Sequence, residues 1–90
     1  MTEYQEYTIR FYEDCTVYLN KEGELHRLNG PAIEYADGTK GWYVDGKKHR
    51  LDGPAFEYTD GTKDWYVNGK WLTERQFKAL TSKLTASNIN

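Results

Sequence analysis

Two pairs of histidine and arginine recur in this sequence at a fixed separation. His26-Arg27 and His49-Arg50 lie 23 residues apart, and Lys48 precedes the second pair. The guanidinium of arginine suits bidentate contact with carboxylate or phosphate groups. In a stacked repeat these side chains line up as a short basic ladder. The pattern predicts a binding site for an acidic partner surface or for a nucleotide phosphate.

An internal role for the same residues is the alternative. Glu34 and Glu57 share the 23-residue separation, and aspartates occur in the turns nearby, so each basic side chain has an acidic neighbour within the chain. Recurrence at the period of a repeat is typical of structural residues. Tyr43 and Tyr66 complete the candidate binding set, because we expect their strand face to be exposed. Exposed aromatic rings beside basic side chains suit a protein contact or a small nucleotide.

The remaining reactive side chains form no catalytic or metal-binding pattern. A tetrahedral zinc site needs four ligands, or three and a water, and neither His26 nor His49 has a second histidine or cysteine near it in sequence. Cys15 likewise has no neighbouring histidine to act as the base that a nucleophile needs. We therefore expect no enzyme activity, no metal and no cofactor.

The histidine–arginine pairs belong to a longer repeat. Residues 26–47 can be laid over residues 49–70, and 17 of these 22 positions are identical. A fainter copy precedes them at the same offset, with Cys15 in the place of Gly38. Terminal units of repeat proteins are often atypical, because they cap an open end. The sequence therefore predicts a degenerate unit at 3–25 and two full units at 26–48 and 49–71.

Turn signals predict that each unit is a hairpin. Asp37-Gly38 and Asp60-Gly61 separate runs rich in aromatic and β-branched residues, the strongest short-range signal for a type I′ turn. Asp45-Gly46 and Asn68-Gly69 add a second turn of the same kind. Strands are expected to pair 32–36 with 40–44 and 55–59 with 63–67, with further edge pairing by the short segments after each second turn.

Strand alternation assigns the faces of these hairpins. One face is predicted to form the stacked core, and Ala32 and Glu34 are expected to point the other way, with Tyr43 and Tyr66. The predicted core consists of Ile33, Tyr35, Trp42, Val44, Phe56, Tyr58, Trp65 and Val67.

The last segment has a helical pattern. Thr73-Glu74-Arg75-Gln76 matches a capping box with Thr73 as N-cap, and Phe77, Leu80 and Leu84 recur at helical spacing. We expect a helix over 73–84 that covers the open end of the last hairpin, and a frayed tail over 85–90. The predicted fold is thus mainly β, an antiparallel hairpin meander of about three 23-residue units with one C-terminal α-helix.

Composition narrows the class of protein further. Ninety residues allow one domain, 1–90, and the formal net charge of −2 gives no basic face for duplex nucleic acid. No apolar run is long enough to span a membrane. A single cysteine and no visible secretory signal favour a reducing, cytoplasmic compartment. Because a chain this small buries little area, association into a homodimer is expected.

The tract 37–47 and its second copy at 60–70 resemble MORN-type repeats, in the variant found in small phage and bacterial proteins. The likeness covers residues 12–72 of the chain. It implies a β-hairpin array that serves as an interaction surface, in a phage-encoded accessory protein acting in the host cytoplasm. Our expectation is a non-enzymatic module that binds a host protein, such as a defence or growth-control factor, and inhibits it. Capture of a small nucleotide and a structural or scaffold role are the alternatives.

Overall fold

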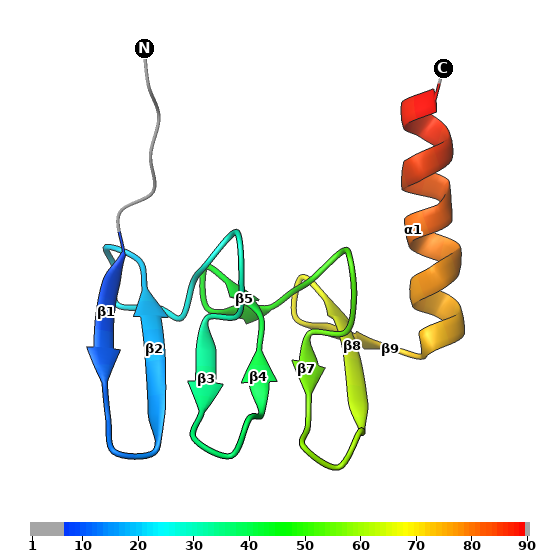
Figure 1. Ribbon diagram of the computed structural model, residues 1–90. Coiled ribbons are helices and arrows are strands. Elements are labelled where there is room, and N and C mark those ends of the chain that lie inside the picture. Colours follow the sequence, from blue (N-terminus) through cyan, green and yellow to red (C-terminus); the bar gives the residue numbers. More distant parts are fainter. Residues whose placement is uncertain (1–6, 90) are drawn as a thin grey trace.

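The computed structural model describes residues 7–89, and it describes the side chains of residues 7–84. Residues 3–6 of the predicted first unit and Asn90 of the predicted tail lie outside this range. Within it the chain is mainly β, with nine strands and one C-terminal helix (Figure 1). The predicted fold class is therefore confirmed.

Three antiparallel hairpins lie side by side in one sheet, with their tips at one edge (Figure 1). The last strand of each hairpin pairs with the first strand of the next, and this pairing makes the sheet continuous across the units. A small second sheet pairs two further strands. The strands of the large sheet are, in spatial order, β1 (Thr8–Phe11), β2 (Cys15–Leu19), β3 (Ile33–Tyr35), β4 (Lys40–Gly41), β7 (Phe56–Glu57), β8 (Lys63–Val67) and β9 (Lys70–Leu72).

The second sheet arises where the predicted strand 40–44 divides. The Trp42 N–H donates to the Ala55 carbonyl of the next unit at 2.7 Å, so the chain leaves the β3–β4 hairpin at this residue. It then forms a second hairpin, in which β5 (Tyr43–Val44) pairs with β6 (Lys47–Lys48). The third unit repeats this arrangement within one strand, because the first half of β8 pairs with β7 and the second half with β9.

The two predicted turns of each unit differ. Asp45 and Asn68 have φ values of 50° and 53°, and each is followed by a glycine at 82°, as a type I′ turn requires. At the hairpin tips the prediction was wrong, because Gly38 has positive φ and Asp37 does not. There the Tyr35 N–H donates to the Thr39 carbonyl across a three-residue loop, a geometry typical of a type I turn with a glycine bulge. The Asp37 carboxylate fixes it by accepting the Thr39 N–H at 2.9 Å.

The first unit carries two compensating changes in length. Its tip is one residue shorter, because the Tyr12 N–H donates to the Cys15 carbonyl where Tyr35 donates to Thr39. Cys15 therefore stands in the place of Thr39, not of Gly38 as expected. The aromatic of the Trp42 position is present as Tyr18, whose N–H donates to the Ala32 carbonyl as that of Trp42 donates to Ala55. A longer second turn then restores the 23-residue offset.

The core differs from the predicted one. Ile33 and Phe56 are buried as expected, but Tyr35 and Tyr58 are exposed. Trp42, Val44, Trp65 and Val67 are half-buried. Ala32 and Ala55, expected on the more exposed face, are fully buried. The reason is that the second hairpins cover the end of the sheet where these alanines lie, whereas the tyrosines, nearer the tips, receive no such cover.

The helix α1 (Glu74–Ile89) closes the last unit. The capping box is confirmed: Thr73 N–H donates to Gln76 Oε1 at 2.9 Å, and Gln76 N–H donates to Thr73 Oγ1 at 3.1 Å. Phe77 is buried, with its ring centroid 4.7 Å from that of Trp65. The predicted tail was wrong over 85–89, which continue the helix, because no proline or glycine follows Lys70 to end it.

Candidate functional site

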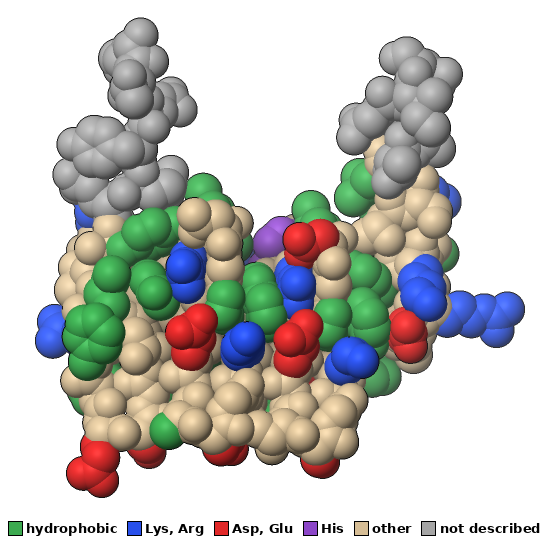
Figure 2. Space-filling view, in the orientation of Figure 1, with side chains coloured by type: hydrophobic (Ala, Val, Ile, Leu, Met, Phe, Trp, Pro, Cys, Tyr) green, Lys and Arg blue, Asp and Glu red, His purple; other side chains and the backbone are tan. Residues whose placement is uncertain are grey.

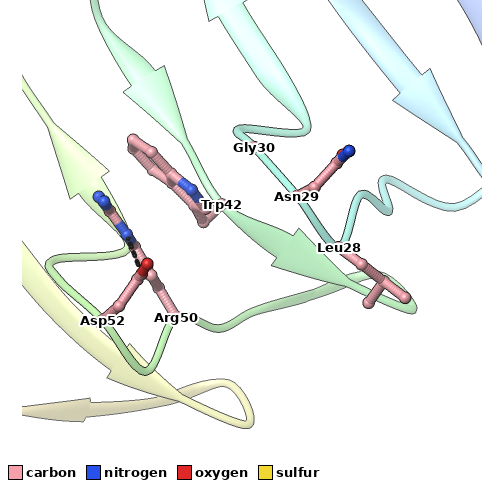
Figure 3. Close-up of a pocket in the computed structure, with 6 residues that line it drawn as sticks. All are labelled: Leu28, Asn29, Gly30, Trp42, Arg50 and Asp52. Atoms are coloured by element: carbon pink, nitrogen blue, oxygen red, sulfur yellow. Dashed lines mark hydrogen bonds and ion pairs between the residues drawn. The ribbon is translucent and has the colours of Figure 1, made fainter.

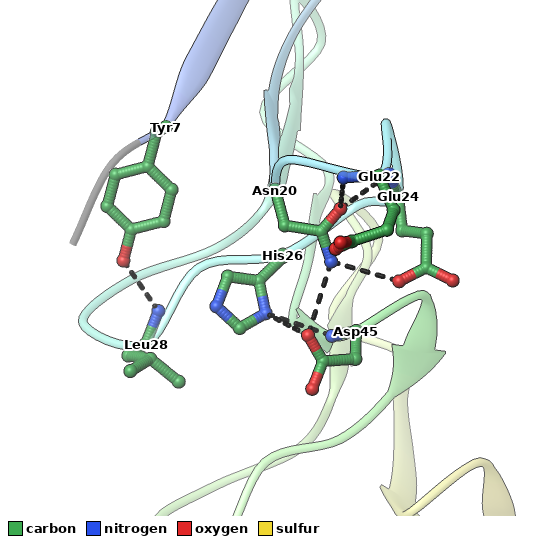
Figure 4. A network of polar contacts seen from close by, with 7 residues as sticks. All are labelled: Tyr7, Asn20, Glu22, Glu24, His26, Leu28 and Asp45. Carbon is green, nitrogen blue, oxygen red and sulfur yellow. Dashed lines mark hydrogen bonds and ion pairs between the residues drawn. The ribbon is translucent and has the colours of Figure 1, made fainter.

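The two histidines of the predicted ladder occupy equivalent positions and hold turns. His26 Nδ1 accepts the Asp45 N–H at 2.9 Å (Figure 4), and His49 Nδ1 accepts the Asn68 N–H at 2.9 Å. The Asp45 carboxylate lies 3.2 Å from the same His26 nitrogen. Each ring therefore stabilises the type I′ turn of its own unit, as the internal alternative expected.

A polar network joins the turn of the first unit to that of the second (Figure 4). Asn20 Oδ1 accepts the N–H groups of Glu22 and Glu24, at 3.0 and 2.9 Å. Its amide nitrogen donates to the Asp45 carboxylate at 3.2 Å. Asn20 thus closes the longer turn of the first unit and also couples it to the second unit.

Arg50 is held by contacts on several sides. Its Nη1 donates to the Pro54 carbonyl and to Glu57, both at 3.0 Å, and its Nε donates to Asp52 at 2.8 Å. Its guanidinium carbon lies 3.7 Å from the ring centroid of Trp42 (Figure 3). A cation this close to an aromatic face is attracted by the quadrupole of the ring.

Arg27 has the same place one unit earlier. Its Nη1 donates to the Pro31 carbonyl at 3.1 Å and lies 3.9 Å from Glu34, and its guanidinium carbon is 4.0 Å from the Tyr18 centroid. A Cβ at Gly30 would lie 2.8 Å from that carbon. The glycine of each Asx-Gly-Pro loop therefore leaves room for an arginine, which stacks on the aromatic ring of the preceding unit.

The other three predicted site residues lie on the opposite face of the sheet. Lys48 Nζ is 4.7 Å from the ring centroid of Tyr66 and 5.1 Å from that of Phe56, and Tyr43 meets Phe56 edge to face. Glu57, the ion-pair partner of Arg50, follows Phe56 in the strand and points the other way. The structure therefore divides the predicted set into a His–Arg group and a Tyr–Lys group, and Tyr43 and Tyr66 are half-buried.

The face with the arginines is balanced in charge. Glu34, Lys40, Glu57 and Lys63 stand opposite one another in successive strand pairs, which gives a row of alternating sign across the sheet. Figure 2 shows this face, with basic and acidic side chains alternating across its middle. Opposite charges in cross-strand pairs attract each other. The acidic and basic side chains of this row therefore neutralise one another, and the row has little net attraction for a charged partner.

A row of exposed tyrosines lies near the hairpin tips and was not predicted from the sequence. Tyr12, Tyr35 and Tyr58 stand where the first strand of each hairpin meets its tip, and their exposed fractions are 55%, 39% and 37%. The 23-residue period would have revealed the row, since the three positions are equivalent. Strand alternation alone placed Tyr35 and Tyr58 in the core.

Several ionisable groups of this region are perturbed. Burial, then the hydrogen bond to the Asp64 carboxylate at 2.9 Å, raises the pKa of Tyr58 to about 12. Burial, then the nearby Tyr35 and Tyr66, raises the pKa of Tyr43. Burial and the adjacent Asp14 raise the pKa of the Cys15 thiol, which lowers the population of the reactive thiolate.

Metal binding, membrane crossing and likeness to known proteins bear on the class of protein. Among the residues that the structure describes, no group of three or more His, Cys, Asp and Glu side chains is placed to hold a metal ion. The described part of the chain also contains no helix with the length and apolar character that crossing a membrane requires. Comparisons of the chain with protein-family models, with curated proteins and with solved structures found no match. The likeness to MORN-type repeats therefore remains a prediction.

Proposed function

We propose that this protein is a non-enzymatic interaction module, which presents one side-chain pattern several times along a sheet to a partner protein. The observation that carries the proposal is the equivalence of the units. Arg27 and Arg50 make matching contacts, and Tyr35 and Tyr58 are exposed to nearly the same extent. A surface built by stacking identical units repeats its contacts at fixed spacing, and such surfaces suit extended partners.

The likeness to MORN-type repeats extends this proposal to a biological setting. In that setting the protein is a phage-encoded accessory protein that binds a protein of its bacterial host and inhibits it. Affinity purification of the folded chain from bacterial lysate, followed by mass spectrometry, tests the proposal. We expect a specific partner that is retained over washing and competed by untagged protein. Recovery of no such partner by soluble, folded bait would contradict it.

A small nucleotide is the second candidate, and one hollow favours it. Leu28, Gly30, Trp42, Arg50 and Asp52 line a depression between two units (Figure 3), with a tryptophan ring and a guanidinium of the kind that base and phosphate recognition uses. The Asp52 and Glu57 bonds already occupy that guanidinium. Thermal shifts with mono-, di- and cyclic nucleotides, compared between the native chain and Arg50→Ala, decide whether it binds them.

A further inference from the structure

The exposed tyrosine row is built by the repeat itself. Tyr12, Tyr35 and Tyr58 stand at the tip-side ends of the first strands of three neighbouring hairpins, in or directly after the strand, and consecutive tyrosines are separated by two strand positions in the continuous sheet. Strands lie about 4.8 Å apart, so consecutive tyrosines stand about 9.6 Å apart. The row extends across two unit junctions.

Both junctions have a hollow that includes two successive tyrosines. Tyr12, Cys15 and Tyr35 contribute to the first. Tyr35, Thr39 and Tyr58 contribute to the second, together with Phe56, whose ring stacks on that of Tyr58 with centroids 5.6 Å apart. Cys15 and Thr39 are the equivalent residues of their units, and both hollows include Tyr35. The first hollow also reaches Thr16 and Glu34, whose side chains point to the opposite face, so the second hollow is the more aromatic.

The charge around these hollows is mainly negative. Glu13 contributes to the first and Asp37 to the second. Asp64 accepts the Tyr58 hydroxyl, whereas Lys48 lies over the Phe56 ring on the same face. Acidic side chains also lie along the tip edge in Figure 2. This contrasts with the balanced row in the middle of the sheet. A partner seated on the tyrosines therefore meets aromatic faces and an excess of acidic side chains, and both favour a cationic ligand.

The spacing selects the conformation of that ligand. A polyproline II helix has three residues per turn and a rise of about 3.1 Å per residue, so side chains at every third position share one face and repeat at about 9.3 Å. An extended β-strand repeats a face every two residues, at about 6.7 Å, and does not match. Aromatic-lined grooves bind polyproline II segments because little conformational entropy is lost on binding.

We propose that the tyrosine row binds a proline-rich, basic segment of a partner protein in the polyproline II conformation, with arginine or lysine at every third position. The two hollows take successive turns of the ligand, and the cations stack on the tyrosine rings beside the acidic residues. This inference rests on the proposed function and names the chemistry of its partner.

A labelled peptide of Arg-Pro-Pro triplets tests it by fluorescence anisotropy against the intact protein. We expect saturable binding that weakens with added salt. It should be at least about tenfold weaker for Arg-Gly-Gly triplets, which lose the preformed helix, and for Glu-Pro-Pro triplets, which reverse the charge. No binding of the Arg-Pro-Pro peptide, or equal binding of all three peptides, would overturn the proposal.

Two variants locate the binding. Tyr35→Ala removes the ring shared by both hollows and should weaken binding about tenfold or more. Asp37→Asn removes a charge but keeps an oxygen for the Thr39 N–H, so it should weaken binding without unfolding the tip. Phe11→Ala, at an exposed residue of the opposite face, is the matched control and should bind as the native chain does. Native far-UV circular dichroism confirms that each variant is folded.

The outcomes separate this inference from the proposed function. A partner captured equally well by the native chain and by Tyr35→Ala would overturn the tyrosine row and leave the interaction module standing. A concentration-dependent dimer in sedimentation that Tyr35→Ala abolishes would show that a second copy occupies the row, which also overturns it. Failure of both peptide binding and partner capture would remove both proposals.

Discussion

The close approach of Gly41 to Phe56 leads us to predict that Gly41→Ala lowers stability. The equivalent position of the third unit provides a control within the same molecule. A Cβ at Gly41 would lie 2.7 Å from Phe56 Cζ and 3.0 Å from Ile33 Cγ2. Phe56 has little room to move, because Tyr58 stacks on it, Tyr43 meets it edge to face and Lys48 lies over it. Gly41→Ala therefore overpacks this junction.

The expected magnitude is the difference of two opposing effects. Overpacking a filled site costs about 1–3 kcal/mol, and replacing glycine by alanine within a strand returns about 0.5–1 kcal/mol. Because Phe56 is held on three sides, we expect a net loss of about 1–2 kcal/mol in the free energy of unfolding. For a domain of this size that lowers Tm by about 4–16 °C. Urea denaturation and thermal melting, both followed by circular dichroism, measure it.

Two comparisons make the result decisive. Asp64→Asn changes the equivalent position of the third unit, where a side chain is already accommodated and the amide oxygen still accepts the Tyr58 hydroxyl, and should alter stability by about 0.5 kcal/mol or less. At the preceding junction Val17 and Ile33 hold the positions of Gly41 and Phe56 and face each other. Valine is larger than glycine and isoleucine is smaller than phenylalanine, so this pair fills the same space differently. Gly41→Val combined with Phe56→Ile copies that pair and should recover at least about 1 kcal/mol relative to the sum of the single changes. A stable Gly41→Ala variant, or simple additivity of the pair, would refute the reasoning.

Three further predictions concern turns, pH and the helix. Asn68→Ala places alanine at a φ of 53° and should cost about 1 kcal/mol in urea denaturation, whereas Asn68→Gly should cost nothing; equal stabilities would contradict this. The folded state raises the pKa of Tyr58 to about 12, so the folded protein keeps a proton that the unfolded chain loses above about pH 10. The contribution of Tyr58 to stability is therefore complete below pH 10 and is lost as pH rises toward 12. Tyrosinate absorbance should show this late titration, and Asp64→Asn should move it to lower pH. Thr73→Ala removes the N-cap and should cost about 1 kcal/mol, seen as faster amide exchange in the first turn of α1; unchanged exchange would argue against the capping box.

The unit, the positions of its turns and the capped helix could all be predicted from local signals. The 23-residue offset aligned the two full copies, Asp45-Gly46 and Asn68-Gly69 formed the expected turns, and the capping box formed as predicted. These features depend on neighbours in sequence or on exact repetition, and a single sequence displays both.

The interior of the array could not be predicted in the same way. In the first unit a one-residue deletion and a one-residue insertion cancel, so Tyr18 was not recognised as the counterpart of Trp42. The division of the strand at Trp42 depends on a hydrogen bond to Ala55 in the next unit, and alternation within one strand cannot show such a bond. Ala32 is buried and Tyr35 is exposed, although Ile33 on the same face as Tyr35 is buried, so burial changes along the strand as well as between its faces.

The candidate site shows the same limit on what can be predicted from the sequence. The equivalence of Arg27 and Arg50 was visible in the sequence, but their roles were not, because the carbonyls of Pro31 and Pro54 that they bind have no sequence signature. Both the partner-binding role and the internal role were consistent with the residue types. The observed contacts favour the internal role, since each guanidinium is enclosed by its own loop.

The placement of Phe77 on Trp65 has a consequence for how such molecules can grow. Arg27 covers the ring of Tyr18, and Arg50 covers the ring of Trp42. The ring of Trp65 is covered by Phe77 of α1, in the place where a following unit would put an arginine. A duplicated segment inserted between Trp71 and Leu72 would bring its own arginine for Trp65 and would offer a new tryptophan to the helix. The molecule can therefore lengthen in whole steps through tandem duplication, with both termini unchanged, and each step would add one more copy of the repeated surface.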